Sequence, residues 1–347
     1  MSGNARIAEV DVLRGLLAIT VVLGHAVQQY ETTIGGFWLA VKDFIYSFHM
    51  PAFVFISGFC AYRALGFSGD GQKAGFLKAR ARRLLVPYFA WGALYFILRA
   101  LAGEHARVPY DYGKIGFLLL GYNPDGSMWF VWALFMATVL VSLAARWIGG
   151  FGLVALTFSI AAAAPFACPE PTWHTVALCA LPTFVFFMSL GAMWRGWLER
   201  RAFPGGVRLR VFLLCCGMLF AGSYYLHVNC LLRPVPWYLL TATSATFLLY
   251  GLSRALVGKW RGAQRALALL GGEAMSIYVL GEPIKVVLRI VLSALGVPLS
   301  AAFPVMVVCM FALPIALLRI IRRNAFMRQL LLGEPCKQHG GSDHAGK

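Results

Sequence analysis

The stretch DVLRGLLAITVVLGHAV, from Asp11 to Val27, is an apolar segment that carries an aspartate, an arginine and a histidine. A run this apolar is typical of a membrane-spanning helix, in which charged groups are costly and tend to face a cavity or one another. At about 100° per residue, Asp11, Arg14 and His25 fall within roughly 60° of arc, with Ala18 on the same line. The stretch therefore predicts a polar stripe that extends about 16 Å from Arg14 to His25 on one helix face.

The composition of the whole chain indicates a polytopic membrane protein. Of its 347 residues, 60% are hydrophobic and 13% are charged, whereas a soluble domain has about 25% charged residues. A net charge of +17 is compatible with nucleic-acid binding, but the basic residues lie between apolar spans, as in the cytoplasmic loops of membrane proteins. We therefore expect no nucleic-acid partner. The eight cysteines form no CxxC pair and mostly lie in apolar runs, so no metal site is expected.

Apolar runs long enough to span a bilayer recur along the chain. With the interrupted fourth run counted once, they predict about ten helices, at residues 11–30, 37–63, 84–102, 114–122 with 128–147, 150–167, 174–194, 209–227, 235–256, 267–292 and 299–321. Basic residues are concentrated in alternate gaps and after the last run, which by the positive-inside rule places both termini in the cytoplasm. The predicted fold is an all-α integral membrane bundle over residues 1–330, followed by a disordered cytoplasmic tail over 331–347.

Two histidines are expected at a similar depth in neighbouring spans. His25 lies about 18 Å from the inner end of the first span, and His49, just before Pro51, lies about 18 Å from the outer end of the second. A neutral imidazole can take a proton from a hydroxyl and return it, so this arrangement is typical of a catalytic site. Structural roles are equally compatible with the pattern, in helix packing for His25 and in a hydrogen-bonded proline kink for His49.

A basic cluster lies where the third span begins. The stretch LKARARRLLVPYF carries the side chains of Lys78, Arg80, Arg82 and Arg83 at the expected inner interface. Such a cluster attracts anionic lipids, and it would equally hold the phosphates of a cofactor, because guanidinium groups match phosphate oxygens.

A second polar stripe is expected in MSIYVLGEPIKVVLRIVL, near the other end of the chain. Glu282, Lys285 and Arg289 fall within roughly 60° of arc if the helix continues past Pro283. If the helix ends at Pro283, Lys285 and Arg289 belong instead to an interfacial amphipathic helix. Glu282 is the member that is hardest to explain as a surface residue.

Together these stretches resemble the membrane-bound acyltransferase-3 family, bacterial enzymes that O-acylate glycans. DVLRGLLAITVVLGH is similar to the first-helix motif of the family, and FHMPAFVFISGF resembles the second-helix motif in its fucose O-acetylase-like variant. RARRLLVPYF, MWFVWALF and MSIYVLGEPI are similar to three further motifs, so the resemblance covers nearly the whole chain. One departure is Gly281, followed by Glu282, where many members carry a histidine.

The resemblance implies an integral-membrane O-acyltransferase of the bacterial inner membrane. Such an enzyme moves an acyl group, by default acetyl, from cytosolic acyl-CoA to a hydroxyl of a cell-surface or lipid-linked glycan. Acyl-CoA is the implied co-substrate, and the implied partners are a glycan or lipid-linked saccharide and the membrane lipids. We expect the anionic head group of CoA on Arg14, Arg82 and Arg83, with the pantetheine arm along the stripe past Ala18.

His25 is then expected to act as a general base on the acceptor hydroxyl or to carry the acyl group transiently. Asp11, His49 and Glu282 complete the expected catalytic set, with His49 or Glu282 orienting His25 or binding the acceptor. A polytopic transporter or exporter of a glycan precursor or small molecule is the alternative, in which the same buried groups form a proton relay. The absence of an internal sequence repeat argues against it.

Overall fold

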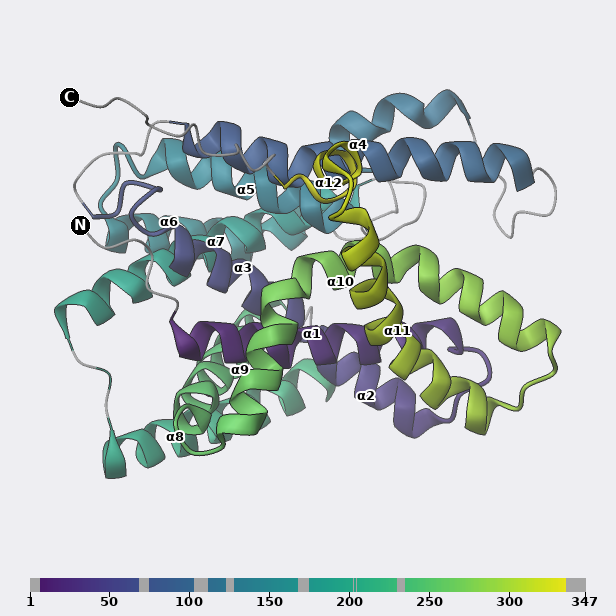
Figure 1. Cartoon of the computed structure of the whole chain (residues 1–347). Coiled ribbons are helices and arrows are strands. Elements are labelled where there is room, and N and C mark those ends of the chain that lie inside the picture. The colour runs from purple at the N-terminus through teal and green to yellow at the C-terminus, as the bar shows by residue number, and fades with distance from the viewer. Residues whose placement is uncertain are drawn as a thin grey trace, which may run out of the picture.

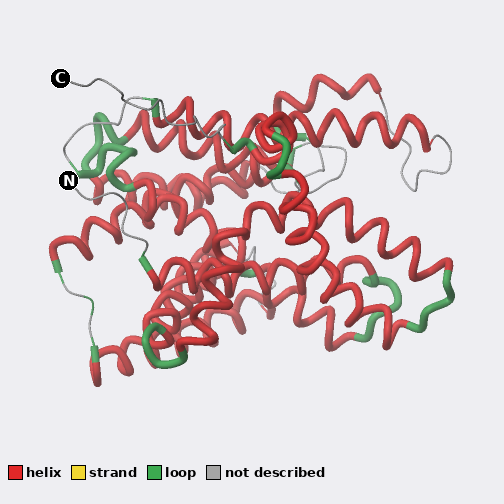
Figure 2. Tube along the Cα trace, viewed as in Figure 1, coloured by secondary structure: helices red, strands yellow, loops and turns green. Residues whose placement is uncertain are grey.

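The computed structural model describes residues 7–68, 75–102, 112–122, 128–167, 175–201, 203, 205–229 and 235–334. Within these ranges the chain is helical and contains no β-strand (Figure 2). The elements labelled in Figure 1, together with the 3-10 helix η2, are α1 (Ala8–Gln29), α2 (Gly36–Tyr46), α3 (His49–Ala61), α4 (Phe76–Ala102), η2 (Tyr112–Leu120), α5 (Trp129–Ala144), α6 (Gly150–Ala167), α7 (Val176–Arg200), α8 (Gly206–Asn229), α9 (Val235–Leu256), α10 (Arg261–Ala294), α11 (Leu299–Ile321) and α12 (Ala325–Leu332).

The all-helical class predicted from the sequence is confirmed for the described residues. Each predicted span coincides with one helix or with two consecutive ones: α2 and α3 share the second run, and η2 and α5 share the fourth. Five helical segments of the described chain are long and apolar enough to cross a membrane: Ala8–Gln29, Gly36–Ala61, Val176–Arg200, Gly206–Asn229 and Leu299–Ile321. The count of ten crossings and the side of each terminus stay predictions.

The helices pack in two groups that meet along α1 and α3 (Figure 1). In one group α7 packs against α3, α5 and α6, and α4 packs against α5. In the other group α10 packs along α1 and α11, while α8 pairs with α9. Contacts of α3 with both α1 and α9 join the two groups. The seam between α1 and the α3–α5 side of the molecule is where the site lies.

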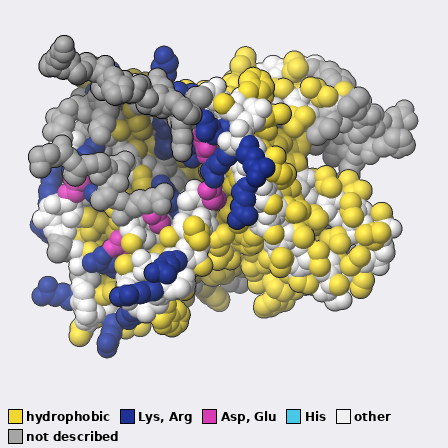
Figure 3. All heavy atoms as spheres, viewed as in Figure 1, with side chains coloured by type: hydrophobic (Ala, Val, Ile, Leu, Met, Phe, Trp, Pro, Cys, Tyr) yellow, Lys and Arg dark blue, Asp and Glu magenta, His cyan; other side chains and the backbone are white. Residues whose placement is uncertain are grey.

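Charge and hydrophobicity are unevenly distributed over the surface seen in Figure 3. Lys and Arg side chains gather on the left and in the centre of this view, whereas the right-hand part is mainly hydrophobic. Figure 2 shows the loops at 30–35 and 295–298 at the right-hand end and the loop at 257–260 at the opposite end. The loop at 257–260, which carries Lys259, thus lies at the other end of the molecule from the loops at 30–35 and 295–298, and the side of the membrane that each end faces stays a prediction.

Glycines allow two pairs of helices to cross at backbone contact. A Cβ atom added to Gly15 of α1 would overlap the carbonyl oxygen of Leu267 in α10, and one added to Gly271 would overlap the carbonyl oxygen of Asp11. In the same way, a Cβ atom added to Gly58 of α3 would overlap the backbone of α7, and one added to Gly191 of α7 would overlap the backbone of α3. Small residues at such crossings let helices approach closely, which is how packing is achieved where lipid removes the hydrophobic driving force.

We expect Gly15→Ala to destabilise the protein by about 1–3 kcal/mol, because the added methyl group overpacks the α1–α10 crossing. Thermal unfolding in detergent measures the effect. Gly222→Ala is the matched control, because no atom lies within 4 Å of the added Cβ at this position of α8. The control is expected to leave stability unchanged or raised, since Ala is the better helix former. Equal effects of the two substitutions would contradict the backbone contact.

The C-terminal helix α12 packs on α4, where the sequence predicted a disordered tail from residue 331. The Asn324 side chain caps the helix by accepting hydrogen bonds from the backbone N–H groups of Phe326 (2.9 Å) and Met327 (3.1 Å). Gly333 ends it with φ 62°, and a Cβ atom added to this residue would overlap the backbone of Arg82 and Arg83. The predicted boundary at 330 therefore falls inside α12, and the rest of the predicted tail, residues 335–347, lies outside the described residues.

Candidate functional site

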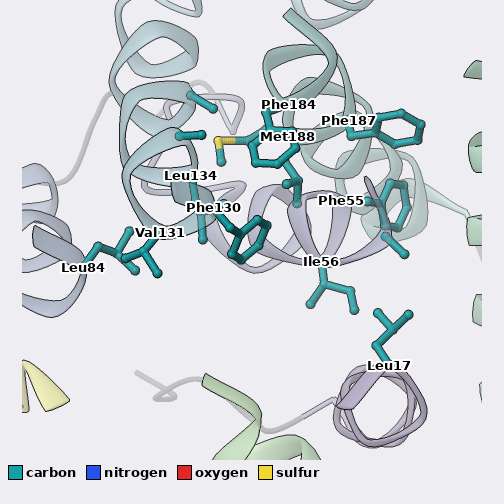
Figure 4. Close-up of a cluster of buried hydrophobic side chains, with 14 of the residues drawn as sticks. Leu17, Phe55, Ile56, Leu84, Phe130, Val131, Leu134, Phe184, Phe187 and Met188 are labelled. Atoms are coloured by element: carbon teal, nitrogen blue, oxygen red, sulfur yellow. The ribbon is translucent and has the colours of Figure 1, made fainter. Parts of the chain in front are cut away.

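A cavity of about 200 Å³ lies at the seam between the two helix groups. It is lined by residues of α1, α3, α4, α5 and α10. The polar end is formed by Arg14, Ser57, Cys60, Arg80 and Arg83, and the apolar end by Val21, Met50, Phe53, Phe130, Ile277 and Tyr278. Figure 4 labels Ile56, Leu84, Phe130 and Leu134, four of the apolar lining residues, and shows Leu17 of α1 opposite Ile56. The cavity is thus a small space that is cationic at one end and apolar at the other.

The arginines at the polar end are held by neighbouring side chains. Arg14 donates a hydrogen bond to Cys60 Sγ (3.2 Å) and lies 3.7 Å from the Asp11 carboxylate. Arg80 donates to the Ser57 hydroxyl, while its Nε is buried without a hydrogen-bond partner among the described residues. Three guanidinium groups around one small space create an excess of positive charge that suits an anionic ligand such as phosphate.

Two residues of the predicted site, Arg82 and Asp11, are not among the described residues that line the cavity. Arg82 is exposed and is not among the described residues that line the cavity. Arg80 and Arg83 line the cavity instead. Residues three apart on a helix lie on nearly the same face, whereas Arg82, two residues after Arg80, points to the opposite side. Asp11 is likewise absent from the described lining. Its carboxylate pairs with the Arg14 guanidinium, so Asp11 holds the arginine and does not itself line the cavity.

The α10 wall of the polar end is fixed by an ion-pair network. Arg322, just after α11, donates two hydrogen bonds to Glu273 (2.7 and 2.8 Å) and two to Glu334 (2.8 and 3.3 Å). Hydrogen bonds to these two carboxylates raise the pKa of the Arg322 guanidinium above its ordinary value. Glu273 lies between Gly272 and Ala274, which both line the cavity. The network therefore links the cavity wall to α11 and to the end of α12.

A buried polar cluster lies beyond the apolar end of the cavity. Its ionisable members are His25 on α1 and Glu282 and Lys285 on α10, which are at most 8% exposed, and the Gln28 amide on α1 completes it. Nδ1 of His25 is 3.2 Å from Gln28 Oε1, 3.3 Å from Lys285 Nζ and 3.6 Å from Glu282 Oε1. Lys285 Nζ is 2.8 and 2.6 Å from the two Glu282 oxygens. His25 and Glu282, predicted as site residues from separate motifs, are thus brought together.

The other imidazole nitrogen of His25 has a different environment. His25 Nε2 is buried and has no hydrogen-bond partner among the described residues. Because Nδ1 faces three polar groups, Nε2 is the nitrogen left to meet a ligand. The cavity lining on α1 ends at Val21, about one helical turn before His25. Tyr278, which lines the cavity, has its ring centre 6.4 Å from that of His25, so it lies next to both the cavity and the imidazole.

Lys285 is the member of the cluster that the predicted site set omitted, although the sequence placed it on the stripe with Glu282. The sequence predicted this stripe on condition that the helix continues past Pro283, and α10 does continue through Pro283 to Ala294. A lysine within an apolar run, three residues after a glutamate, was the available sequence signal. In the structure this lysine is 6% exposed. A Cβ atom added to Gly281 would contact Met310 Cε at 3.9 Å and no member of the cluster. Glu282 is therefore the residue of this motif that reaches the site.

His49 lies at the edge of the cluster. Its Nδ1 is 2.9 Å from the carbonyl oxygen of Ile45, and its ring centre is 4.8 Å from that of Tyr46. The Tyr46 ring centre is also 6.5 Å from that of His25. The predicted neighbourhood of the two histidines is present, with Tyr46 in contact with both rings. Because Nδ1 of His49 is held by the backbone, the geometry favours a positioning role for this residue.

The fold and the site together define a helical membrane protein with a buried ionisable cluster next to an arginine-lined cavity. The chain belongs to the acyltransferase-3 family, because residues 7–319 match its acyltransferase domain. This family is membrane-bound, which agrees with the long apolar helices. No solved structure matches the chain.

Two nodulation proteins are similar to this chain. It is 33% identical over 205 residues to nodulation protein NolL of Sinorhizobium fredii (strain NBRC 101917 / NGR234), a match that covers 57% of this chain and 51% of the relative. It is 32% identical over 143 residues to nodulation protein NolL of Mesorhizobium japonicum (strain LMG 29417 / CECT 9101 / MAFF 303099), a match that covers 40% of this chain and 36% of the relative. The match thus spans about half of the first relative and about a third of the second.

Proposed function

We propose that this chain is an integral-membrane O-acyltransferase of the bacterial inner membrane that moves an acyl group, in the simplest case acetyl, from acyl-CoA to a hydroxyl of a glycan or lipid-linked saccharide. The observation that carries the proposal is the cavity, which leads from Arg14, Arg80 and Arg83 to Tyr278 beside His25. Membership of the acyltransferase-3 family supports the reaction class.

The shape and charge of the cavity suit an acyl-CoA donor. The phosphates of CoA would be bound by the three guanidinium groups, and the slender pantetheine arm would lie along Ala18 and Val21 towards Tyr278. A volume of about 200 Å³ is below the roughly 300–1,000 Å³ of pockets that hold compact drug-sized ligands. The space is therefore sized for the acyl end of the pantetheine arm and not for a whole CoA molecule, and it favours a short acyl group.

In the proposed reaction, Nε2 of His25 takes the proton of the acceptor hydroxyl while the hydroxyl oxygen attacks the thioester carbonyl carbon. This requires a proton on Nδ1, which donates it in a hydrogen bond to Gln28 Oε1 at 3.2 Å, while the Lys285 ammonium directs its own hydrogens to the Glu282 carboxylate. The tetrahedral intermediate collapses with cleavage of the carbon–sulfur bond, and the leaving thiolate takes the proton from Nε2. The Glu282 carboxylate, 3.6 Å from Nδ1, favours the imidazolium that exists between the two proton transfers, and the Lys285 ammonium at 3.3 Å opposes it, so the imidazolium readily returns its proton to the leaving thiolate.

Transfer of labelled acetyl groups tests the proposed activity. Membranes that contain the protein are incubated with [14C]acetyl-CoA, and label is measured in the extracted glycan and lipid-linked saccharide fractions. Base-labile label that depends on the protein supports O-acylation. If acetyl-CoA neither stabilises the purified protein thermally nor donates label to any fraction, the proposed function is wrong.

We expect Arg80→Gln to weaken acetyl-CoA binding about 10- to 100-fold, because charge-assisted hydrogen bonds to a buried ligand are lost. Arg82→Gln is the matched control, an arginine two residues away that is exposed and outside the described cavity lining. It is expected to change the affinity less than threefold. Thermal shift titration with acetyl-CoA measures both, with the unliganded melting temperature as a check on folding. A larger effect at Arg82 would contradict the assigned donor end.

A further inference from the structure

Two polar groups lie at the end of α1 opposite Arg14, where the mechanism above does not use them. The hydroxyl of Tyr30 is buried and has no hydrogen-bond partner among the described residues. The Nε of Arg289 on α10 is also buried without such a partner. Tyr30 follows α1 five residues after His25, and Arg289 lies four residues after Lys285, whose ammonium is 3.3 Å from His25, so the packing of α1 on α10 brings the two side chains into one region. Two buried donors without an acceptor are costly unless a ligand supplies one.

The nearby carboxylates do not provide this acceptor. Glu282 is in the ion pair with Lys285, and Glu31 forms an ion pair with Lys42. Asp43 lies 3.8 Å from the same lysine ammonium. Arg289 has no ion pair or hydrogen bond with any residue that the structure describes. The positive charge of Arg289 is therefore available to an anion from outside the described chain.

The position of Arg289 relates this charge to His25. Glu282, Lys285 and Arg289 are spaced three and four residues apart on α10, so they share one face of the helix. Arg289 lies about 6 Å further along the axis than Lys285, which is 3.3 Å from His25 Nδ1. On α1, Tyr30 is five residues after His25, or about 7.5 Å along the axis. A ligand held by both groups would approach His25 from the side opposite the arginine-lined cavity.

We propose that Tyr30 and Arg289 form an oxyanion subsite that binds a carboxylate or phosphate group of the saccharide acceptor. This inference rests on the proposed function, since it assigns the chemical class of the acceptor at the same site. The guanidinium fork matches a carboxylate or phosphate, and the phenol donates one further hydrogen bond. The acceptor is accordingly an acidic or phosphorylated saccharide, with the reacting hydroxyl a few ångströms from the anionic group. The phosphate of a lipid headgroup has the same chemistry. The experiment distinguishes a lipid headgroup from a saccharide as the source of the anion.

Binding of small saccharide anions tests the subsite. The purified protein is placed in nanodiscs of phosphatidylcholine, and its thermal unfolding is followed against D-glucuronate, D-glucose 1-phosphate and D-glucose at constant ionic strength. We expect saturable stabilisation by at least one of the two anionic sugars and none by glucose. Arg289→Gln is expected to weaken that binding tenfold or more, and Tyr30→Phe to weaken it about threefold to tenfold. Arg289→Lys keeps the charge without the fork and should fall between wild type and Arg289→Gln.

Arg265→Gln is the matched control, an exposed arginine near the other end of α10. It should bind the anionic sugar as the wild type does. Equal binding by Arg289→Gln and wild type, or no response to either anionic sugar, would overturn the subsite. So would stabilisation that appears only when phosphatidylglycerol replaces part of the phosphatidylcholine, because the anion would then be a lipid headgroup. Acetyl-CoA titration separates the two proposals: Arg289→Gln should bind the donor normally, whereas failure of wild type to bind it counts against the proposed function alone.

Discussion

His25→Ala is expected to lower the rate of acyl transfer about 10²- to 10⁴-fold, the range of a lost general base, while acetyl-CoA still binds. The physical reason is the placement of Nε2, which is buried without a partner among the described residues while Nδ1 is held by Gln28. The measurement is the initial rate of label transfer from [14C]acetyl-CoA at saturating donor. The rate constant should fall with little change in donor affinity, because the cavity lining on α1 ends at Val21.

The control for this experiment is a second histidine outside the cluster. His227 of α8 has its ring 5.7 Å from that of Tyr238 and contacts none of the groups around His25. His227→Ala should therefore leave the transfer rate within a factor of two of wild type. Near-normal transfer by folded His25→Ala protein would refute the proposed mechanism. Loss of donor binding in the same variant would instead place His25 in the donor site.

We expect Lys285→Met to lower the free energy of unfolding by about 3–5 kcal/mol. The lysine is 6% exposed and pairs with Glu282, which is 2% exposed, at 2.6 Å. Removing the cation leaves a buried carboxylate without the charge that offsets its desolvation. The melting temperature in detergent should fall by several degrees, and the yield of folded protein should fall with it.

Two comparisons make this prediction specific to the buried ion pair. Addition of Glu282→Gln to Lys285→Met removes the unpaired charge, so the double variant should recover most of the lost stability. Arg63→Met removes one partner of the pair with Glu199, whose side chains are 62% and 25% exposed, and should cost less than about 1 kcal/mol. If Lys285→Met costs no more stability than Arg63→Met, the ion pair between Lys285 and Glu282 is not buried and the prediction is wrong.

The helices of this protein were largely predictable from local sequence. The apolar runs and the basic gaps between them depend on residue type alone, and each run coincides with one described helix or with a consecutive pair. Irregular backbone near His49 was predicted from Pro51, and the structure has a break between α2 and α3 just before His49. The helix α12 was not predicted, because it depends on contacts distant in sequence, such as the hydrogen bond from Trp91 of α4 to the Leu331 carbonyl oxygen (3.2 Å).

The candidate site was predictable in part. The stripe on α1 and the stripe on α10 each follow from helical periodicity within one segment, so Arg14, His25 and Glu282 were named from sequence. The choice between Arg80 and Arg82 was not available in the same way, because it depends on which face of α4 turns towards α1 and α3. The role of Lys285 also needed the structure, since its partners are Glu282 on its own helix and His25 on another.

The sequence by itself determined a helical, apolar chain with two polar stripes, because helix periodicity and the cost of charge in lipid act within single segments. The tertiary structure alone decided that these stripes meet. Gly15 and Gly271 let α1 and α10 cross at backbone contact, and that approach brings Lys285 and Glu282 within 3.3 and 3.6 Å of His25 Nδ1. It also decided which arginines line the cavity, because the facing of one helix towards another is set by the packing of the whole bundle and not by any one segment.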